Sequence, residues 1–160
     1  MRLYRRRVLA VSIGLALIAA TAVAAVALAS AGSGTSALIL APRSTLSDSV
    51  QVNQDRIKFQ TKDPTDLVTQ QVTFAPHAFS GWHHHPGVIL VLVKSGTVTT
   101  HDENCQTKTY SAGQAFVESG TAPFMVSNES DTETAVDVAT QVAPAGSPFR
   151  IEDDPPPCAG

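Results

Sequence analysis

Basic side chains are scarce in most of this 160-residue chain. Residues 32–160 carry 7 of its 11 Lys and Arg residues, against all 14 of its Asp and Glu residues. The other four basic residues stand near the start, as Arg2, Arg5, Arg6 and Arg7. A body this acidic lacks the basic surface that neutralises phosphates, so we predict no nucleic-acid partner. Its 43% hydrophobic residues are enough for the core of one domain, which excludes wholesale disorder.

Cysteine is also scarce, because the chain holds only Cys105 and Cys158. Neither has a nearby histidine in a nucleophile context, and the chain has no G-x-S-x-G elbow, P-loop or G-x-G-x-x-G motif. The signatures of those catalytic classes are therefore absent. In an oxidising compartment two cysteines that can reach each other usually pair, so we predict a Cys105–Cys158 disulfide. Two free thiols are the alternative.

Acidic residues are missing from the first 31 positions, which have the layout of a secretory signal. A basic head precedes an uncharged apolar run at 8–29, and cleavage is plausible after Ala31 in Ala29-Ser30-Ala31. The run of 22 residues is also long enough to span a bilayer as an uncleaved anchor helix. Both alternatives place the body outside the cytoplasm, either extracellular or on the outer face of the plasma membrane. The membrane is then contacted only through this segment.

No helical periodicity follows residue 41, and short β-branched runs separated by turn residues predict strands instead. We place them at 50–59, 68–74, 88–93, 97–101, 108–110, 115–117, 124–126 and 135–142. The uninterrupted apolar run at 88–93 (VILVLV) is typical of a strand buried on both faces. The spacing predicts an all-β sandwich or barrel. The residues that we assign to its hydrophobic core are Phe74, Val88, Leu90, Leu92, Phe116 and Val126.

This pattern divides the chain into four parts. Residues 1–31 are the signal peptide or membrane anchor, and the Ser/Thr/Ala-rich residues 32–49 are a linker. A single small β-barrel occupies 50–142. The proline-rich and acidic residues 143–160 form an irregular strap, which the predicted disulfide ties back to the barrel.

Three consecutive histidines, His83, His84 and His85, are the main candidate for chemistry. Side chains on an extended chain alternate between faces, so His83 and His85 point the same way and His84 points the opposite way, towards solvent. Two neutral imidazoles on one face begin a site for Zn, Cu, Fe or Ni. Catalytic metals usually have at least three protein ligands, so the pair alone is incomplete.

The residues around this cluster resemble the first sequence motif of the cupin superfamily. That motif has His-x-His, a glutamate three or four residues later, and a glycine turn after six more. His83, His85 and Gly96 fall in register with it. The end points of the second cupin motif fit Gly113 and Asn128. The resemblance covers about residues 68–142 and implies a cupin-type jelly-roll barrel that follows the N-terminal helix.

The chain departs from the family pattern where cupins hold their metal. Ile89 stands at the first-motif glutamate position, and Phe124 stands at the second-motif histidine position. Two of the four implied ligands remain, so the resemblance implies a degenerate site with an apolar lining. Glu118 has no clear orientation towards it. We place Trp82, Ile89 and Phe124 around the pocket, with core packing as the alternative for Trp82.

Two functions from different classes follow from the resemblance. The favoured one is an exported cupin-domain protein that binds a small molecule or is non-catalytic. The alternative is a metal-dependent oxygenase or isomerase in which His83 and His85 hold Fe, Mn, Ni, Cu or Zn as a Lewis acid or oxygen activator. The sequence names no ligand, leaves open whether any metal binds, and leaves monomer and homodimer open.

Overall fold

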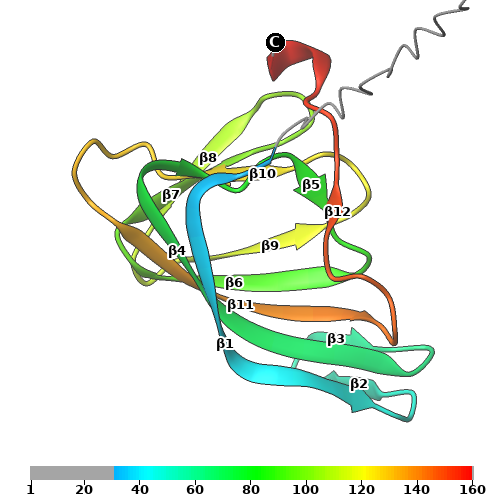
Figure 1. Cartoon of the computed structure of the whole chain (residues 1–160). Coiled ribbons are helices and arrows are strands. Elements are labelled where there is room, and N and C mark those ends of the chain that lie inside the picture. The colour runs from blue at the N-terminus through cyan, green and yellow to red at the C-terminus, as the bar shows by residue number, and fades with distance from the viewer. Residues whose placement is uncertain (1–30, 160) are drawn as a thin grey trace, which may run out of the picture.

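The computed structural model describes residues 31–159, so the predicted export or anchor helix at 8–29 lies outside the described residues (Figure 1). The described part is all-β apart from one short 3-10 helix. No helix in the described part is long and apolar enough to cross a membrane. Its elements are β1 (Ser33–Leu46), β2 (Gln51–Gln54), β3 (Ile57–Gln60), β4 (Thr65–Phe79), β5 (His83–His84), β6 (Val88–Ser95), β7 (Thr97–His101), β8 (Thr107–Ser111), β9 (Ala115–Ser119), β10 (Met125–Ser127), β11 (Ala135–Pro144), β12 (Ile151–Glu152) and η1 (Pro157–Ala159).

Eight of these strands form one antiparallel sheet, in the order β8-β7-β10-β4-β11-β6-β9, with β1 paired to β4. The sheet curls into a nearly closed barrel, which confirms the predicted all-β barrel (Figure 1). The turn between β6 and β7 needs Gly96, whose φ is 70°. A Cβ at this position would lie 2.7 Å from the carbonyl oxygen of Thr134 and 2.8 Å from the Cα of Ala135. The sequence therefore has glycine where the fold leaves no room for a side chain.

Strand β6 corrects the predicted core. Val93 is 3% exposed and Leu92 is 54% exposed, and the strand alternates in this way along its length. Ile89 and Val91 also point inward, whereas Val88 and Leu90 point outward. The assignment of Val88, Leu90 and Leu92 to the core is wrong, because the run is apolar at every position and therefore carries no sign of which face is buried. Phe74, Phe116 and Val126 are in the core as predicted.

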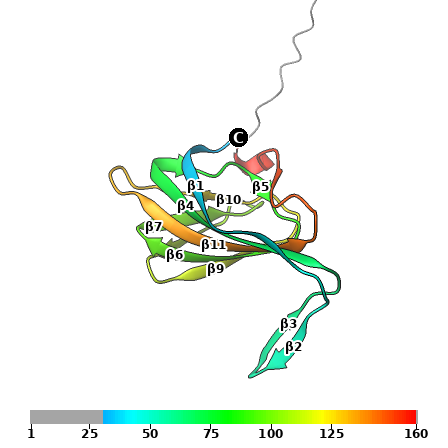
Figure 2. The same cartoon turned by 60° about the horizontal axis from the view of Figure 1, so that its bottom comes forward.

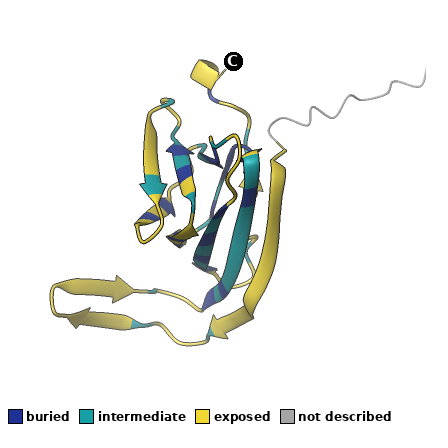
Figure 3. Cartoon of the chain, turned by 90° about the vertical axis from the view of Figure 1, so that its left-hand side faces the viewer, coloured by how far each residue is buried: buried dark blue, intermediate teal, exposed yellow. Residues whose placement is uncertain are grey.

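Residues 32–49 are not a linker. Ser33–Leu46 is a 14-residue strand that pairs along β4, and Asp66 of β4 also accepts hydrogen bonds from the side chains of Thr45 and Arg43. Figure 3 shows β1 lying along the outside of the barrel with an exposed surface. Strands β2 and β3 then form a separate hairpin that projects from the barrel (Figure 2). This hairpin lies within the segment predicted as the first part of the barrel.

The segment after β11 is an anchored strap. Cys105 and Cys158 form a disulfide with a Cα–Cα distance of 6.1 Å, as the sequence predicted. Between β11 and this bond, β12 pairs with β5, the strand that carries the histidines. Both ends of the strap are thus fixed to the barrel, so its residues are held against the site described below.

Candidate metal centre

Strand β5 brings His83 and His85 together. Their ring centroids are 4.8 Å apart and their ring planes are nearly perpendicular, at 87°. Both side chains are buried. His84 points away from them, as the alternation predicted, but it does not point to solvent. Its Nδ1 lies 2.8 Å from a carboxylate oxygen of Asp153, so it holds the strap against β5.

Backbone carbonyls fix the orientation of both buried rings. The Nδ1–H of His83 donates to the carbonyl oxygen of Gly81 at 2.8 Å, and the Nδ1–H of His85 donates to the carbonyl oxygen of Phe149 in the strap. A carbonyl oxygen can only accept a hydrogen bond, so each Nδ1 carries a proton and each Nε2 is left to face the interior of the site. The second-shell partners of metal-binding histidines set the tautomer in this way.

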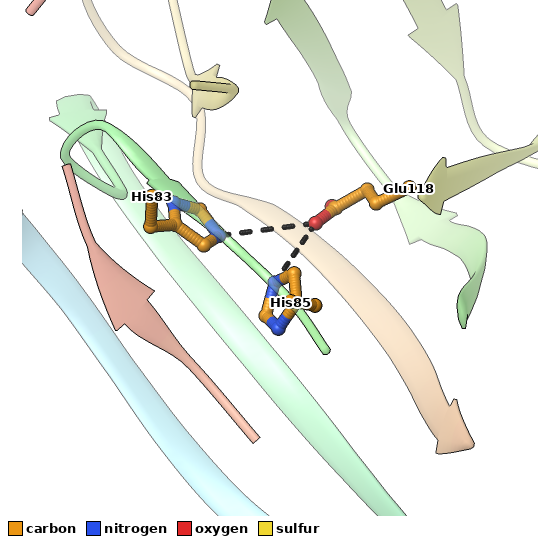
Figure 4. A group of neighbouring side chains, drawn as sticks. All are labelled: His83, His85 and Glu118. Atoms are coloured by element: carbon orange, nitrogen blue, oxygen red, sulfur yellow. Dashed lines mark ion pairs between the residues drawn. The ribbon is translucent and has the colours of Figure 1, made fainter. Parts of the chain in front are cut away.

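A buried carboxylate faces both lone pairs. Glu118 Oε2 lies 3.1 Å from His85 Nε2 and 3.8 Å from His83 Nε2 (Figure 4). Glu118 is on β9, directly opposite Ile89 on β6. Ile89 stands where the cupin motif has its glutamate. The carboxylate at this site therefore comes from the neighbouring strand, β9, instead of from β6.

Burial keeps His83 ready to act as a ligand. Loss of hydration, together with the positive charge of the nearby Arg150 guanidinium, lowers the pKa of His83 from 6.5 to about 4. The imidazole is therefore neutral at pH 7, as a metal ligand must be. Binding of a cation would not first require His83 to lose a proton.

The three donor atoms fit a divalent transition metal. Two imidazole nitrogens and one carboxylate oxygen lie within 4.8 Å of one another, and all three residues are buried. Ligand bonds of about 2.0–2.2 Å at tetrahedral angles place donor atoms about 3.3 Å apart. The separations of Glu118 Oε2 from the two Nε2 atoms, 3.1 and 3.8 Å, bracket that spacing. A divalent cation placed among these three donor atoms would be coordinated by all of them at once.

The sequence missed Glu118, although a signal for it was present. Strand β9 alternates, with Phe116 and Glu118 buried and Ala115, Val117 and Ser119 exposed. Phe116 was assigned to the core, and the residue two places along a strand shares its face. That rule places the carboxylate inside the barrel with the histidines.

Comparison with known proteins identifies the barrel. The cupin domain model matches residues 70–139, which span β5, β6 and β9 of the site. Residues 70–139 are therefore similar to cupin domains, and the barrel has a cupin-like fold. A search of curated proteins found no match.

The comparison with solved structures found similar chains at low sequence identity. A cupin-like protein from Thermotoga maritima is 16% identical, with a TM-score of 0.50, over 56% of this chain and 65% of its own. The cupin domain of an XRE family transcriptional regulator from Enterobacter cloacae is 19% identical, with a TM-score of 0.46, over 69% of this chain and 96% of its own. An oxalate oxidase in complex with glycolate is 19% identical, with a TM-score of 0.45, over 53% of this chain. This chain spans 45% of that oxidase.

The cluster of His83, His85 and Glu118 opens into a cavity of about 650 Å³, within the usual size range of small-molecule sites. His83, His85 and Glu118 line it, together with Ile89. Its other lining residues come mainly from β1, β4, β6, β11 and the strap.

The other predicted pocket residues lie outside this lining. Trp82 is buried against His101, with ring centroids 6.5 Å apart. Phe124 pairs through its backbone with His83, and its side chain packs against the hydrophobic core.

The remaining two histidines have other partners. His77 Nε2 lies 3.1 Å from Asp131 on the surface. His101 Nε2 lies 2.8 Å from the Ser127 hydroxyl. Neither belongs to the cluster of His83, His85 and Glu118.

Proposed function

We propose that this chain is an exported cupin that binds a small organic molecule through a divalent metal ion held by His83, His85 and Glu118. One observation carries the proposal. Both imidazoles donate Nδ1–H to backbone carbonyls, so both Nε2 lone pairs are directed towards the same buried carboxylate. The ligand set is thus oriented before any metal arrives.

The chemistry of the donor set narrows the role of the metal. Fe, Mn, Ni, Cu or Zn suits two imidazoles and one carboxylate, and such an ion supplies an open coordination position for an oxygen atom of the ligand. The ion's two positive charges exceed the single negative charge of Glu118. The centre therefore favours an anionic ligand oxygen, and the apolar wall at Ile89 excludes water from it.

A metal-dependent enzyme of oxygenase or isomerase type is the second candidate. Three protein ligands with open positions are the usual arrangement at catalytic rather than structural metal sites, which favours this candidate. Turnover of a bound compound would distinguish it from simple binding.

Two features support export. The apolar run at 8–29 has the layout of a secretory signal or an anchor, and the Cys105–Cys158 disulfide is of a kind that persists outside the reducing cytoplasm. Fractionation of cells that produce the untagged full chain tests this part. Recovery of the protein from the cytoplasm with reduced cysteines would contradict it.

Metal stoichiometry tests the function directly. The untagged full chain, stripped with chelator and reloaded, should bind about one equivalent of a divalent transition metal. The His83→Ala/His85→Ala variant should bind none. His77→Ala is the matched control, because His77 is exposed and paired with Asp131. A parent protein that stays free of metal and melts like the double variant would contradict the proposal.

A further inference from the structure

The cavity beside the candidate metal centre has a buried carboxyl group on its inner wall. Asp137 of β11 lines the cavity and is 4% exposed. Its Oδ1 atom is buried without a hydrogen-bond partner among the described residues. A buried acceptor without a partner costs about 1–3 kcal/mol. Natural structures rarely keep such groups, so this one calls for a specific explanation.

Strand pairing locates Asp137 relative to the metal centre. Glu118, Ile89 and Gln141 lie in one row across β9, β6 and β11. Asp137 is four residues from Gln141 on the same face of β11, about 13 Å along the strand at 3.3–3.4 Å per residue. Ala139 lies between them on that face. The cavity is thus polar at each end of this stretch and apolar in the middle.

Gln141 supplies a second acceptor of the same kind near the metal end. It is buried and lines the cavity, and its Oε1 atom has no hydrogen-bond partner among residues 31–159. Both oxygens accept hydrogen bonds, so both fit a ligand that carries donor groups.

No cation in the cavity wall is committed to Asp137. The two arginines of the lining are paired elsewhere, Arg43 with Asp66 and Arg150 with Glu152. Burial raises the pKa of Asp137 to about 7, and the negative charge of Glu118 adds to this effect. A carboxyl group whose pKa is raised in this way suits an uncharged ligand group as its partner. Transfer of an unpaired ion into an apolar cavity is strongly disfavoured.

We propose that the cavity binds an elongated organic acid that carries a hydroxyl group at its far end, with the hydroxyl donating to Asp137 Oδ1. The acid carboxylate occupies the open position of the metal, and the apolar middle lies against Val91 and Ala139. This assignment rests on the proposed metal centre. It adds the class of ligand and names Asp137 as the residue that selects it.

Matched pairs of linear acids test the inference. ω-Hydroxyalkanoates and the methyl-ended alkanoates with the same number of heavy atoms differ only in the terminal group. Each pair is titrated calorimetrically into the Zn²⁺-loaded full chain, over chain lengths of about four to twelve heavy atoms along the backbone. One narrow range of lengths should bind about tenfold more tightly as the hydroxy acid, the value of one buried hydrogen bond. Shorter acids should show no such preference.

The Asp137→Leu variant isolates the selecting residue. It keeps the branched shape and the number of side-chain heavy atoms, and it should remove the hydroxyl preference while methyl-ended acids still bind. Its melting temperature should rise, because an unsatisfied buried acid is lost. Asp131→Leu, at an exposed carboxylate, is the control and should keep the preference.

The outcomes separate the two proposals. Zinc uptake without a hydroxyl preference at any length overturns the inference and leaves the metal centre intact. A preference that survives in Asp137→Leu, or tighter binding of the corresponding ω-amino acids, also overturns it. Failure to take up zinc overturns the proposed function itself. The length series needs no variant, so it decides the matter even where Asp137→Leu fails to fold.

Discussion

Glu118 shows how a ligand set can be completed from an unexpected position. The motif comparison points to Ile89 as the place of a lost carboxylate, and Glu118 is the residue paired with it on the next strand. Both side chains point into the barrel, so the acidic group stays at the histidines although its chain position differs. His83 and His85 then need only the carbonyl partners that fix their tautomers.

Removal of the charge on Glu118 should weaken metal binding with little change in shape. In Glu118→Gln the affinity for Zn²⁺ should fall by more than about 100-fold, since even outer-shell partners are worth 10–100-fold. Competition with a chromophoric chelator measures this affinity. Glu129→Gln is the matched control at an exposed glutamate. Equal affinities in the two variants would show that Glu118 is not a ligand.

Two buried groups of the metal-free protein should give opposite responses to pH. The folded-state pKa of Asp137 is raised from 3.8 to about 7, so its folded form holds a proton that the unfolded chain loses. Relative to Asp137→Asn, the parent should therefore lose stability as the pH rises from about 4 to 7, by up to about 1.4 kcal/mol per pH unit. The pKa of His83 is lowered to about 4, so its contribution is lost as the pH falls from about 6.5 to 4.

Urea unfolding at several pH values, with chelator present, measures both effects. The contribution of these two groups to the free energy of unfolding of the parent should be nearly constant over pH 4.5–6.5. The proton that Asp137 binds on folding offsets the proton that His83 releases. Asp137→Asn should show the rise of stability with pH that His83 produces. A constant difference between the parent and the variant across this range would contradict the assignment to Asp137.

At the scale of single elements, strand β6 separates two kinds of apolar residue. Val93 packs in the core, whereas Leu92 is 54% exposed on the outer face. Nothing within the VILVLV run distinguishes them. The pairing of β6 with β9 and β11 decides which face of β6 points into the barrel, and therefore which of its residues are buried.

Alanine substitution in β6 should follow this alternation. Val93→Ala should lower the free energy of unfolding by about 2 kcal/mol, because it leaves a cavity in a packed core. Leu92→Ala should lower it by less than about 0.5 kcal/mol, as is usual for surface positions. Denaturant titration of the two variants measures the difference. Equal losses would mean that the outer face of β6 is also covered.

At the scale of the whole molecule, the strap at residues 143–160 holds the histidines of the candidate metal centre in place. Phe149 supplies the carbonyl that orients His85, and Asp153 pairs with His84. Arg43 lies over the Phe149 ring at 3.7 Å, which fixes the strap to β1 as well. The disulfide at Cys158 holds the far end of this segment.

Loss of the disulfide should therefore weaken both the fold and the site. Cys105→Ser/Cys158→Ser should lower the free energy of unfolding by roughly 4 kcal/mol, from the entropy of closing a loop with a sequence separation of 53. Its zinc affinity should also fall, because the Phe149 carbonyl is held less firmly. Thermal melts and chelator competition, each with and without reductant for the parent, measure these effects. Unchanged zinc affinity would show that the strap orients His85 without the disulfide.

The sequence by itself determined what depends on neighbours along the chain. Alternation on an extended segment is a local stereochemical rule, so it places His83 and His85 on one face whatever the rest of the fold does. Turn residues between β-branched runs, such as Gly96, likewise determined an all-β domain. These features needed no knowledge of which strands pair.

Only the tertiary structure decided what depends on distant pairing. The addition of Glu118 to the histidines, the outward face of β6, the pairing of residues 33–46 with β4 and the buried Asp137 all follow from strand register. Register is set by the packing of the whole sheet, and a shift of one residue turns every side chain of a strand to the other face. Sequence alone therefore named two of the three residues of the candidate metal centre, and the curled sheet supplied the carboxylate and the cavity.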